Sequence, residues 1–135
     1  MANHVYPKWK ERLMQGASNA NLQDNTVRAV LVDTDVYTYS DSHEFVSDLT
    51  GIVGTQSAPF TNKTFTNAVF DADNISLPSV NGPSGEAIVI FIGTTANPFG
   101  ARLVTYLDSG FSGLPATLDG SDIPIVWSPD GIFKL

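Results

Sequence analysis

The sequence lacks most of the residues that carry catalysis or metal binding. Its 135 residues include no cysteine, which excludes disulfides, thiolate catalysis and cysteine-ligated zinc. Histidine occurs only at His4 and His43. No apolar run approaches the roughly 18 residues of a membrane-spanning helix, and the residues after Met1 lack the apolar core of a secretory signal. We therefore expect no membrane association.

Basic residues are also scarce. The chain has 7 Lys and Arg against 14 Asp and Glu, a net charge of −7. Three of the seven, Lys8, Lys10 and Arg12, lie near the N-terminus, and only Lys63 lies between Arg28 and Arg102. Binding a phosphate backbone requires clustered basic side chains. The composition therefore predicts that nucleic acid is not a partner.

The N-terminal residues show the clearest helical pattern. Tyr6, Trp9 and Leu13 follow the i, i+3, i+7 spacing of one helix face, and Met14 at i+8 can extend it. A proline opens the segment 7–15 and suits a first helical turn, and Gly16 is a plausible stop. We expect a short amphipathic helix here, within an N-terminal arm of residues 1–16. Its apolar stripe packs either on its own domain or on a neighbouring molecule.

The rest of the chain indicates β structure. The length predicts a single domain spanning 1–135, and short apolar segments alternate with turns rich in Gly, Pro, Asn and Asp. The expected strands are 27–32, 61–70, 75–80, 87–92, 103–107, 123–127 and 132–135, with 87–92 at the centre of a sheet. No crossover helix is visible after residue 50, which argues against a parallel fold. We predict a mainly β domain: an antiparallel β-sandwich or barrel with the N-terminal helix and one helical turn near 41–49.

The last fourteen residues suggest how the chain finishes. Ser128-Pro129-Asp130-Gly131 has the composition of a tight turn, and we expect it to join strands 123–127 and 132–135 as a hairpin. Three of the final four residues are apolar, so this end must be held by the fold. On this reading Leu135 belongs to the fold, and the N-terminal arm is the free extension that docks.

Candidate catalytic groups are few, and a structural role is the better interpretation of each. Adjacent residues on a helical turn point apart, so His43 and Glu44 do not by themselves make an acid–base pair. Asp33 and Asp35 share one side of a strand end, where Asp also forms turns. The segment 71–74 starts like a calcium loop but lacks the later Gly and Glu of that motif. We expect no enzyme activity, and no catalytic, cofactor or metal site.

Aromatic residues are the best candidates for contacts with partners. Trp is enriched at the energetic centres of interfaces. Trp127 is better explained as a core residue, whereas for Trp9 both roles stay open. We predict that Tyr6, Trp9 and Leu13 contact a partner. Phe111 is a further candidate, because exposed loop aromatics such as Phe99 and Phe111 would be needed by a carbohydrate-binding module.

Nearly the whole chain carries an ordered set of short motifs. They are Val30-Leu31-Val32-Asp33-Thr34, Tyr37, His43-Glu44-Phe45 with Ser47-Asp48, Val69-Phe70-Asp71-Ala72-Asp73, Glu86-Ala87-Ile88-Val89-Ile90, Arg102-Leu103, Tyr106-Leu107-Asp108, Gly113-Leu114-Pro115 and Ile132-Phe133-Lys134-Leu135. In this order they resemble a family of small proteins encoded among the virion genes of tailed bacteriophages. The segment 51–59 departs from the family pattern.

The resemblance implies a non-enzymatic component of the virion, assembled in the cytoplasm of a bacterial host. We expect a capsid decoration or cement protein that stabilises the head, with the major capsid protein or other virion proteins as partners. Association as a symmetric homo-oligomer is also expected. A tail or neck component is the first alternative, and a host-surface carbohydrate-binding module is an alternative of another class.

Overall fold

The apolar run Ala87–Ile92 forms β6, the central strand of the largest sheet. In this computed structural model, which describes residues 3–82, 84–96, 100–114 and 118–135, the strand order is β1-β7-β6-β2-β3. Antiparallel partners flank β6 on both sides: β2 (Val27–Val32) and β7 (Arg102–Leu107). Short edge strands, β1 (His4–Val5) and β3 (Ile52–Val53), complete the sheet. The central position predicted for 87–92 is confirmed.

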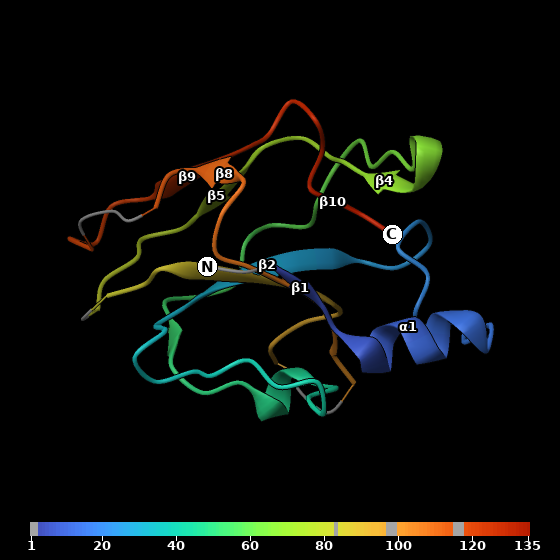
Figure 1. Cartoon of the computed structure of the whole chain (residues 1–135). Helices are drawn as coiled ribbons and strands as arrows, with labels where there is room; N and C mark the ends of the chain where they lie inside the picture. Colours follow the sequence, from blue (N-terminus) through green and yellow to red (C-terminus); the bar gives the residue numbers. More distant parts are fainter. Residues whose placement is uncertain (1–2, 83, 97–99, 115–117) are drawn as a thin grey trace.

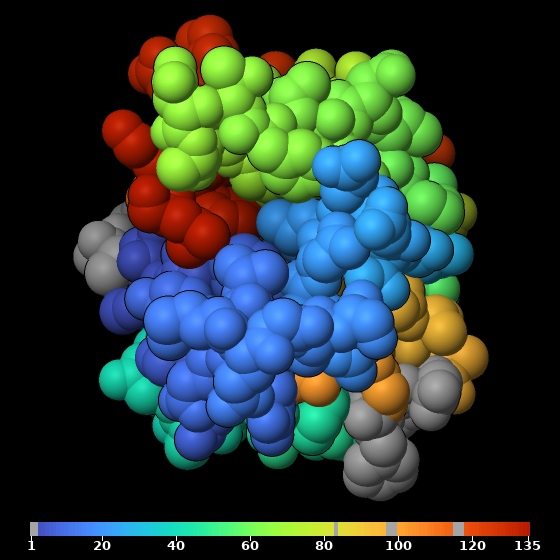
Figure 2. Space-filling view, turned by 90° about the vertical axis from the view of Figure 1, so that its right-hand side faces the viewer, coloured from blue at the N-terminus to red at the C-terminus, as the bar shows by residue number. Residues whose placement is uncertain are grey.

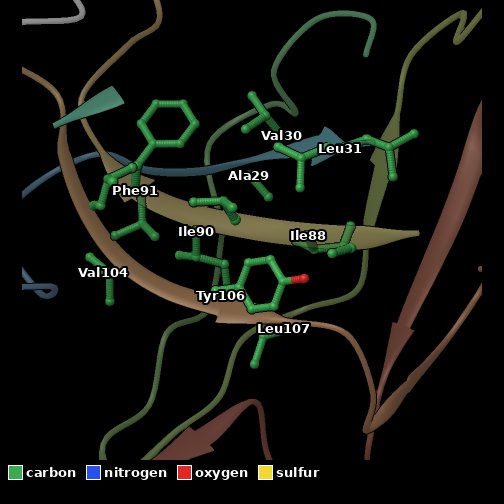
Figure 3. Close-up of a cluster of buried hydrophobic side chains, with 14 of the residues drawn as sticks. Ala29, Val30, Leu31, Ile88, Ile90, Phe91, Val104, Tyr106 and Leu107 are labelled. Atoms are coloured by element: carbon green, nitrogen blue, oxygen red, sulfur yellow. The ribbon is translucent and has the colours of Figure 1, made fainter. Parts of the chain in front are cut away.

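Both faces of this sheet are buried. Every residue of β6 and β7 is buried, and successive side chains of a strand point to opposite faces. Figure 3 shows Val30 and Phe91 on one side of the ribbons and Ile90 and Leu107 on the other. This explains why the sequence of β6 is continuously apolar rather than alternating. Each fully buried aliphatic side chain contributes roughly 1.5–3 kcal/mol.

Two smaller sets of strands form a second layer. One is a three-stranded antiparallel sheet of β5 (Ile75–Leu77), β9 (Ile123–Trp127) and β8 (Phe111–Ser112). The other pairs β4 (Val69–Phe70) with β10 (Phe133–Lys134). Figure 1 shows both sets above the five-stranded sheet, with β5 in contact with β2. The prediction of a mainly β, antiparallel fold is confirmed, and the barrel alternative is wrong because the sheets do not close.

The predicted helix is present as α1 (Pro7–Met14). Trp9 is 1% exposed, donates its indole N–H to the carbonyl of Ala20 at 2.8 Å, and meets the edge of Phe133 with ring centroids 5.9 Å apart. Tyr6, at the start of the helix, is 0% exposed. The apolar stripe therefore packs on its own domain.

The N-terminal residues are not a free arm. His4 pairs with Tyr106 as part of β1. The side chain of Asn3 accepts a hydrogen bond from the backbone N–H of Asp108 at 2.8 Å and donates one to the carbonyl of Ser109 at 3.1 Å. Residues 3–16 are thus packed on the domain rather than extending from it, and docking of this segment on a neighbouring molecule stays a prediction.

The helical turn near 41–49 is also present, as the 3-10 turn Val46–Asp48. The carboxylate of Asp48 accepts hydrogen bonds from the backbone N–H groups of Glu44 at 2.8 Å and Phe45 at 3.1 Å. These bonds satisfy donors that the short turn leaves without partners. Val46 faces the core.

The C-terminal segment differs from the expected hairpin. The tight turn forms, with the N–H of Gly131 bonded to the carbonyl of Ser128 at 3.0 Å, but the strand after it pairs with β4 instead of β9. Gly131 has φ +106° and lies against Val69, so a side chain there would collide with β4. The turn thus directs the chain away from β9. Leu135 is 53% exposed and is not a core residue.

The predicted strand 61–70 is mostly irregular. Only its last two residues form β4, and they follow a 3-10 turn, Thr66–Ala68, in which Asn67 has φ 55°. A single β-branched run does not specify a strand when no neighbouring strand is there to pair with it. No helix in the described part of the chain is long and apolar enough to cross a membrane.

Replacing Trp9 tests whether the helix belongs to the core. Trp9→Ala should lower the free energy of unfolding by about 3–5 kcal/mol, because it removes a buried aromatic and leaves a cavity. Urea denaturation followed by circular dichroism measures this change. Met14→Ala on the same helix is the control, since Met14 is 81% exposed and should change stability by less than about 0.5 kcal/mol. Equal effects of the two changes would show that α1 is not packed as described.

Candidate functional site

An apolar hollow lies between α1 and the β4–β10 pair. Its volume is about 310 Å³. The residues lining it are Trp9, Leu13, Asn21, Leu22, Gln23, Phe65, Ala68, Val69, Phe70, Phe133 and Leu135. The hollow lies beside the edge-to-face contact between Trp9 of α1 and Phe133 of β10.

A second hollow, of about 530 Å³, lies along the other side of the same elements. It is lined by Val5, Pro7, Lys10, Glu11, Leu13, Met14, Lys134 and Leu135. Leu13 and Leu135 line both hollows, so the two are neighbours. We call the pair the α1–β10 groove. Figure 2 shows this face, hollowed between the helix in blue, the C-terminal residues in red and the segment of residues near 65 in green.

Large apolar side chains are exposed along this groove. Met14 is 81% exposed, Leu135 53% and Phe65 40%. Isolated exposed apolar residues are common on protein surfaces, but these three line one continuous groove. Contiguous apolar surface of this kind marks binding sites. The groove is therefore the candidate functional site.

The margin of the groove is basic, although the chain is acidic. Lys10 and Lys134 both line the second hollow and are exposed. Neither takes part in an ion pair with a described residue, whereas Glu11 pairs with Lys8 at 3.7 Å. Two ammonium groups of seven basic residues are thus available beside exposed apolar surface.

Tyrosine and histidine form a second cluster, on the side of α1 away from the groove. The Tyr37 hydroxyl lies 2.7 Å from the Tyr6 hydroxyl and 2.8 Å from Nδ1 of His43. Burial raises the pKa of Tyr6 well above its ordinary value and that of Tyr37 to about 12. Both hydroxyls therefore stay protonated at neutral pH and serve as hydrogen-bonding groups. The cluster fastens the segment 37–43 to the start of α1.

The acid–base candidates are held in structural bonds. His43 bonds to Tyr37, while Glu44 pairs with Arg102 at 2.9 Å and with Arg12 at 3.4 Å. Their side chains thus serve different partners. Arg102 also lies over the ring of Phe45, 5.1 Å from its centroid. This network fixes the 44–46 segment against the edge of β7, where Leu103 N–H bonds to the carbonyl of Glu44.

The acidic candidates for cation binding are turn residues. Asp33 accepts a hydrogen bond from the N–H of Asp35 at 2.9 Å. Asp71 accepts one from the N–H of Ala72, and Asp73 accepts bonds from the side chains of Thr61 and Asn62. No three His, Asp or Glu side chains of the described residues are grouped as a metal site would require.

The residues predicted to contact a partner differ in how exposed they are. Tyr6 and Trp9 are buried within the chain, 0% and 1% exposed, so their side chains serve the core, and a contact with a partner stays a prediction. Leu13 is half-buried and lines both hollows. Phe111 is half-buried, with its ring 6.1 Å from that of Trp127. Phe99 lies outside the described residues.

Sequence reasoning missed three residues of the groove. The helical period placed Met14 with the apolar stripe of α1, but Met14 was not predicted to contact a partner, and the structure leaves it 81% exposed. Lys134 and Leu135 had no comparable signal, because their place beside α1 depends on the pairing of β10 with β4.

Asp48 makes stability depend on acid pH. Partial burial raises its pKa, but the hydrogen bonds from the N–H groups of Glu44 and Phe45 and the charge of His43 outweigh this, so the pKa is lowered. The stabilisation is present above about pH 4 and is lost as pH falls through the lowered pKa. The difference in unfolding free energy between wild type and Asp48→Asn should therefore shrink between about pH 5 and pH 2. Urea denaturation at each pH measures it.

Ser47→Ala, a change at the exposed neighbouring position, is the control because it removes no titrating group. A difference for Asp48→Asn that stays constant across this pH range would contradict the assigned role of the carboxylate.

No protein-family model matches this chain, and no curated protein matches it significantly. The resemblance to phage virion proteins thus stays a prediction.

Proposed function

We propose that this chain is a non-enzymatic structural protein of a tailed-phage virion, a capsid decoration or cement protein that binds its neighbours through the α1–β10 groove. The observation that carries the proposal is the groove: exposed Met14, Leu135 and Phe65 lie along hollows with a basic margin on an acidic chain. The ordered motifs described above supply the virion setting.

The hydrogen-bonding pattern of the polar residues supports a structural role. A general base needs an accessible lone pair and a substrate site beside it. Nδ1 of His43 is engaged by Tyr37, and Glu44 is engaged by two arginines. The groove is lined mainly by apolar side chains, with two amides, two lysines and Glu11, which pairs with Lys8. Such a lining suits binding of another polypeptide.

Binding through the groove would stabilise a shell by mass action. A partner that binds only the assembled state shifts the equilibrium toward that state. Burying the exposed parts of Met14 and Leu135 contributes about 1–3 kcal/mol for each side chain, and immobilising the partners costs several kcal/mol. Weak single sites become effective when many copies bind together. Association of this chain as a symmetric homo-oligomer would add to that effect.

A tail or neck component would use the same groove on another part of the virion. The place of the protein in the virion, on the head or on the tail, therefore separates the two alternatives. The carbohydrate-binding alternative has less support. A sugar-binding platform needs an open aromatic face, but Phe111 is half-buried and Trp127 is 6% exposed.

Fractionated virions test the proposal. In a phage that encodes this chain, mass spectrometry of purified virions and of tail-less heads should detect the protein in both at many copies per particle. Detection on tails alone would replace the decoration role by the tail alternative. Absence from washed virions would reject a virion role altogether.

Variants connect the virion with the groove. Met14→Glu should reduce the copies retained on heads, because a charge then lies in the apolar contact. Val126→Glu is the matched control, since Val126 is 46% exposed on β9, outside the groove. Equal retention of the two variants would show that the groove is not the contact.

A further inference from the structure

We infer that the groove binds an acidic amphipathic segment of another protein. Apolar side chains of that segment would enter the hollow beside Trp9 and Phe133, and its carboxylates would lie against Lys10 and Lys134. The inference deepens the proposed function by stating the chemistry of the partner, and it rests on that function only for the biological setting.

The apolar part of the argument comes from the first hollow. Its floor is formed by Trp9 and Phe70, which are 1% and 2% exposed, and by the half-buried Phe133. Phe65, 40% exposed, lies at its margin. A space of about 310 Å³ between aromatic rings accepts a large apolar side chain. Leu13 and Leu135 continue this apolar surface into the second hollow.

The charged part comes from the second hollow. Lys10 on α1 and Lys134 on β10 line it from opposite elements, and neither has an ionic partner among the described residues. A carboxylate between two ammonium groups gains from both, most strongly where apolar surface excludes water. The one acidic residue of this lining, Glu11, is paired with Lys8. An acidic segment therefore meets two ammonium groups here.

The same charges disfavour other occupants. A two-fold dimer through this groove would bring four lysines, two from each copy, into one interface. An anionic membrane or a nucleic acid would be attracted by two lysines but repelled by the net charge of −7. A short acidic segment avoids this repulsion because it contacts only the groove.

Selection from a random displayed peptide library tests the inference without a known partner. The full chain is immobilised as bait, and peptides eluted by the free protein are sequenced. The expected consensus has two or more large apolar residues with adjacent Asp or Glu. A basic or uncharged consensus, or no enrichment over empty support, would overturn the inference.

Variants then locate the site for the selected peptide. Fluorescence anisotropy should show affinity weakened about tenfold or more by Lys10→Glu with Lys134→Glu, because two attractive contacts become repulsive. Met14→Glu should weaken binding as well. The matched control is Val126→Glu, which adds a carboxylate outside the lining. Binding that is equally sensitive to this control would place the peptide elsewhere.

Light scattering, which measures self-association, tests whether a second copy of the chain occupies the groove. If the chain self-associates at micromolar concentration and Met14→Glu abolishes that association, a second copy occupies the groove and the inference is wrong. Peptide binding at the groove, with no copies on virions, would reject the proposed function and leave this inference standing. If the protein is present on virions but the selected peptides show no acidic consensus, the proposed function stands and this inference is rejected.

Discussion

The packing of Trp9 holds the two ends of the chain together. Its indole bonds to the carbonyl of Ala20 and its ring meets the edge of Phe133, so one side chain joins α1, the following loop and the last strand. The α1–β10 groove exists as a consequence. An edge-to-face contact joins the helix to the two-residue strand at this point, and Trp9 and Phe133 both line the first hollow. The residue that fixes the fold at this point also shapes the site.

The centre of the fold was predictable from the sequence and its edges were not. Continuous apolar runs such as 27–32 and 87–92 are typical of strands buried on both faces, and the structure buries them so. At the edges, pairing is decided by contacts between distant segments. The turn 128–131 was recognised correctly, but Gly131 lies against Val69, and that long-range contact turns β10 towards β4 instead of β9. No local pattern in the last fourteen residues reports this.

The same limit applies to the site. Leu13 was identified from the helical period, because one face of a helix can be read locally. Tyr6 and Trp9 lie on the same stripe, and the sequence left open whether the stripe faces its own domain or a partner. The stripe faces its own domain because Trp9 contacts Phe133 and Ala20. Phe133 is distant in the sequence, and Ala20 lies in the irregular loop after α1. Lys134 and Leu135 join Lys10 and Met14 although more than a hundred residues separate them, so their shared groove follows from the topology.

The distribution of charge bears on which partner the groove could select. An acidic chain repels copies of itself and most acidic proteins at long range. Arg12 and Arg102 are held by Glu44, and Lys63 is held by the carbonyls of Leu22 and Asn25 at 2.6 and 2.8 Å. These basic groups support the fold and are not available to a partner. Lys10 and Lys134 remain uncommitted, and both lie beside exposed apolar surface. We expect a partner that brings apolar and acidic groups together in one short segment to bind best, because either kind alone gains only part of the contact.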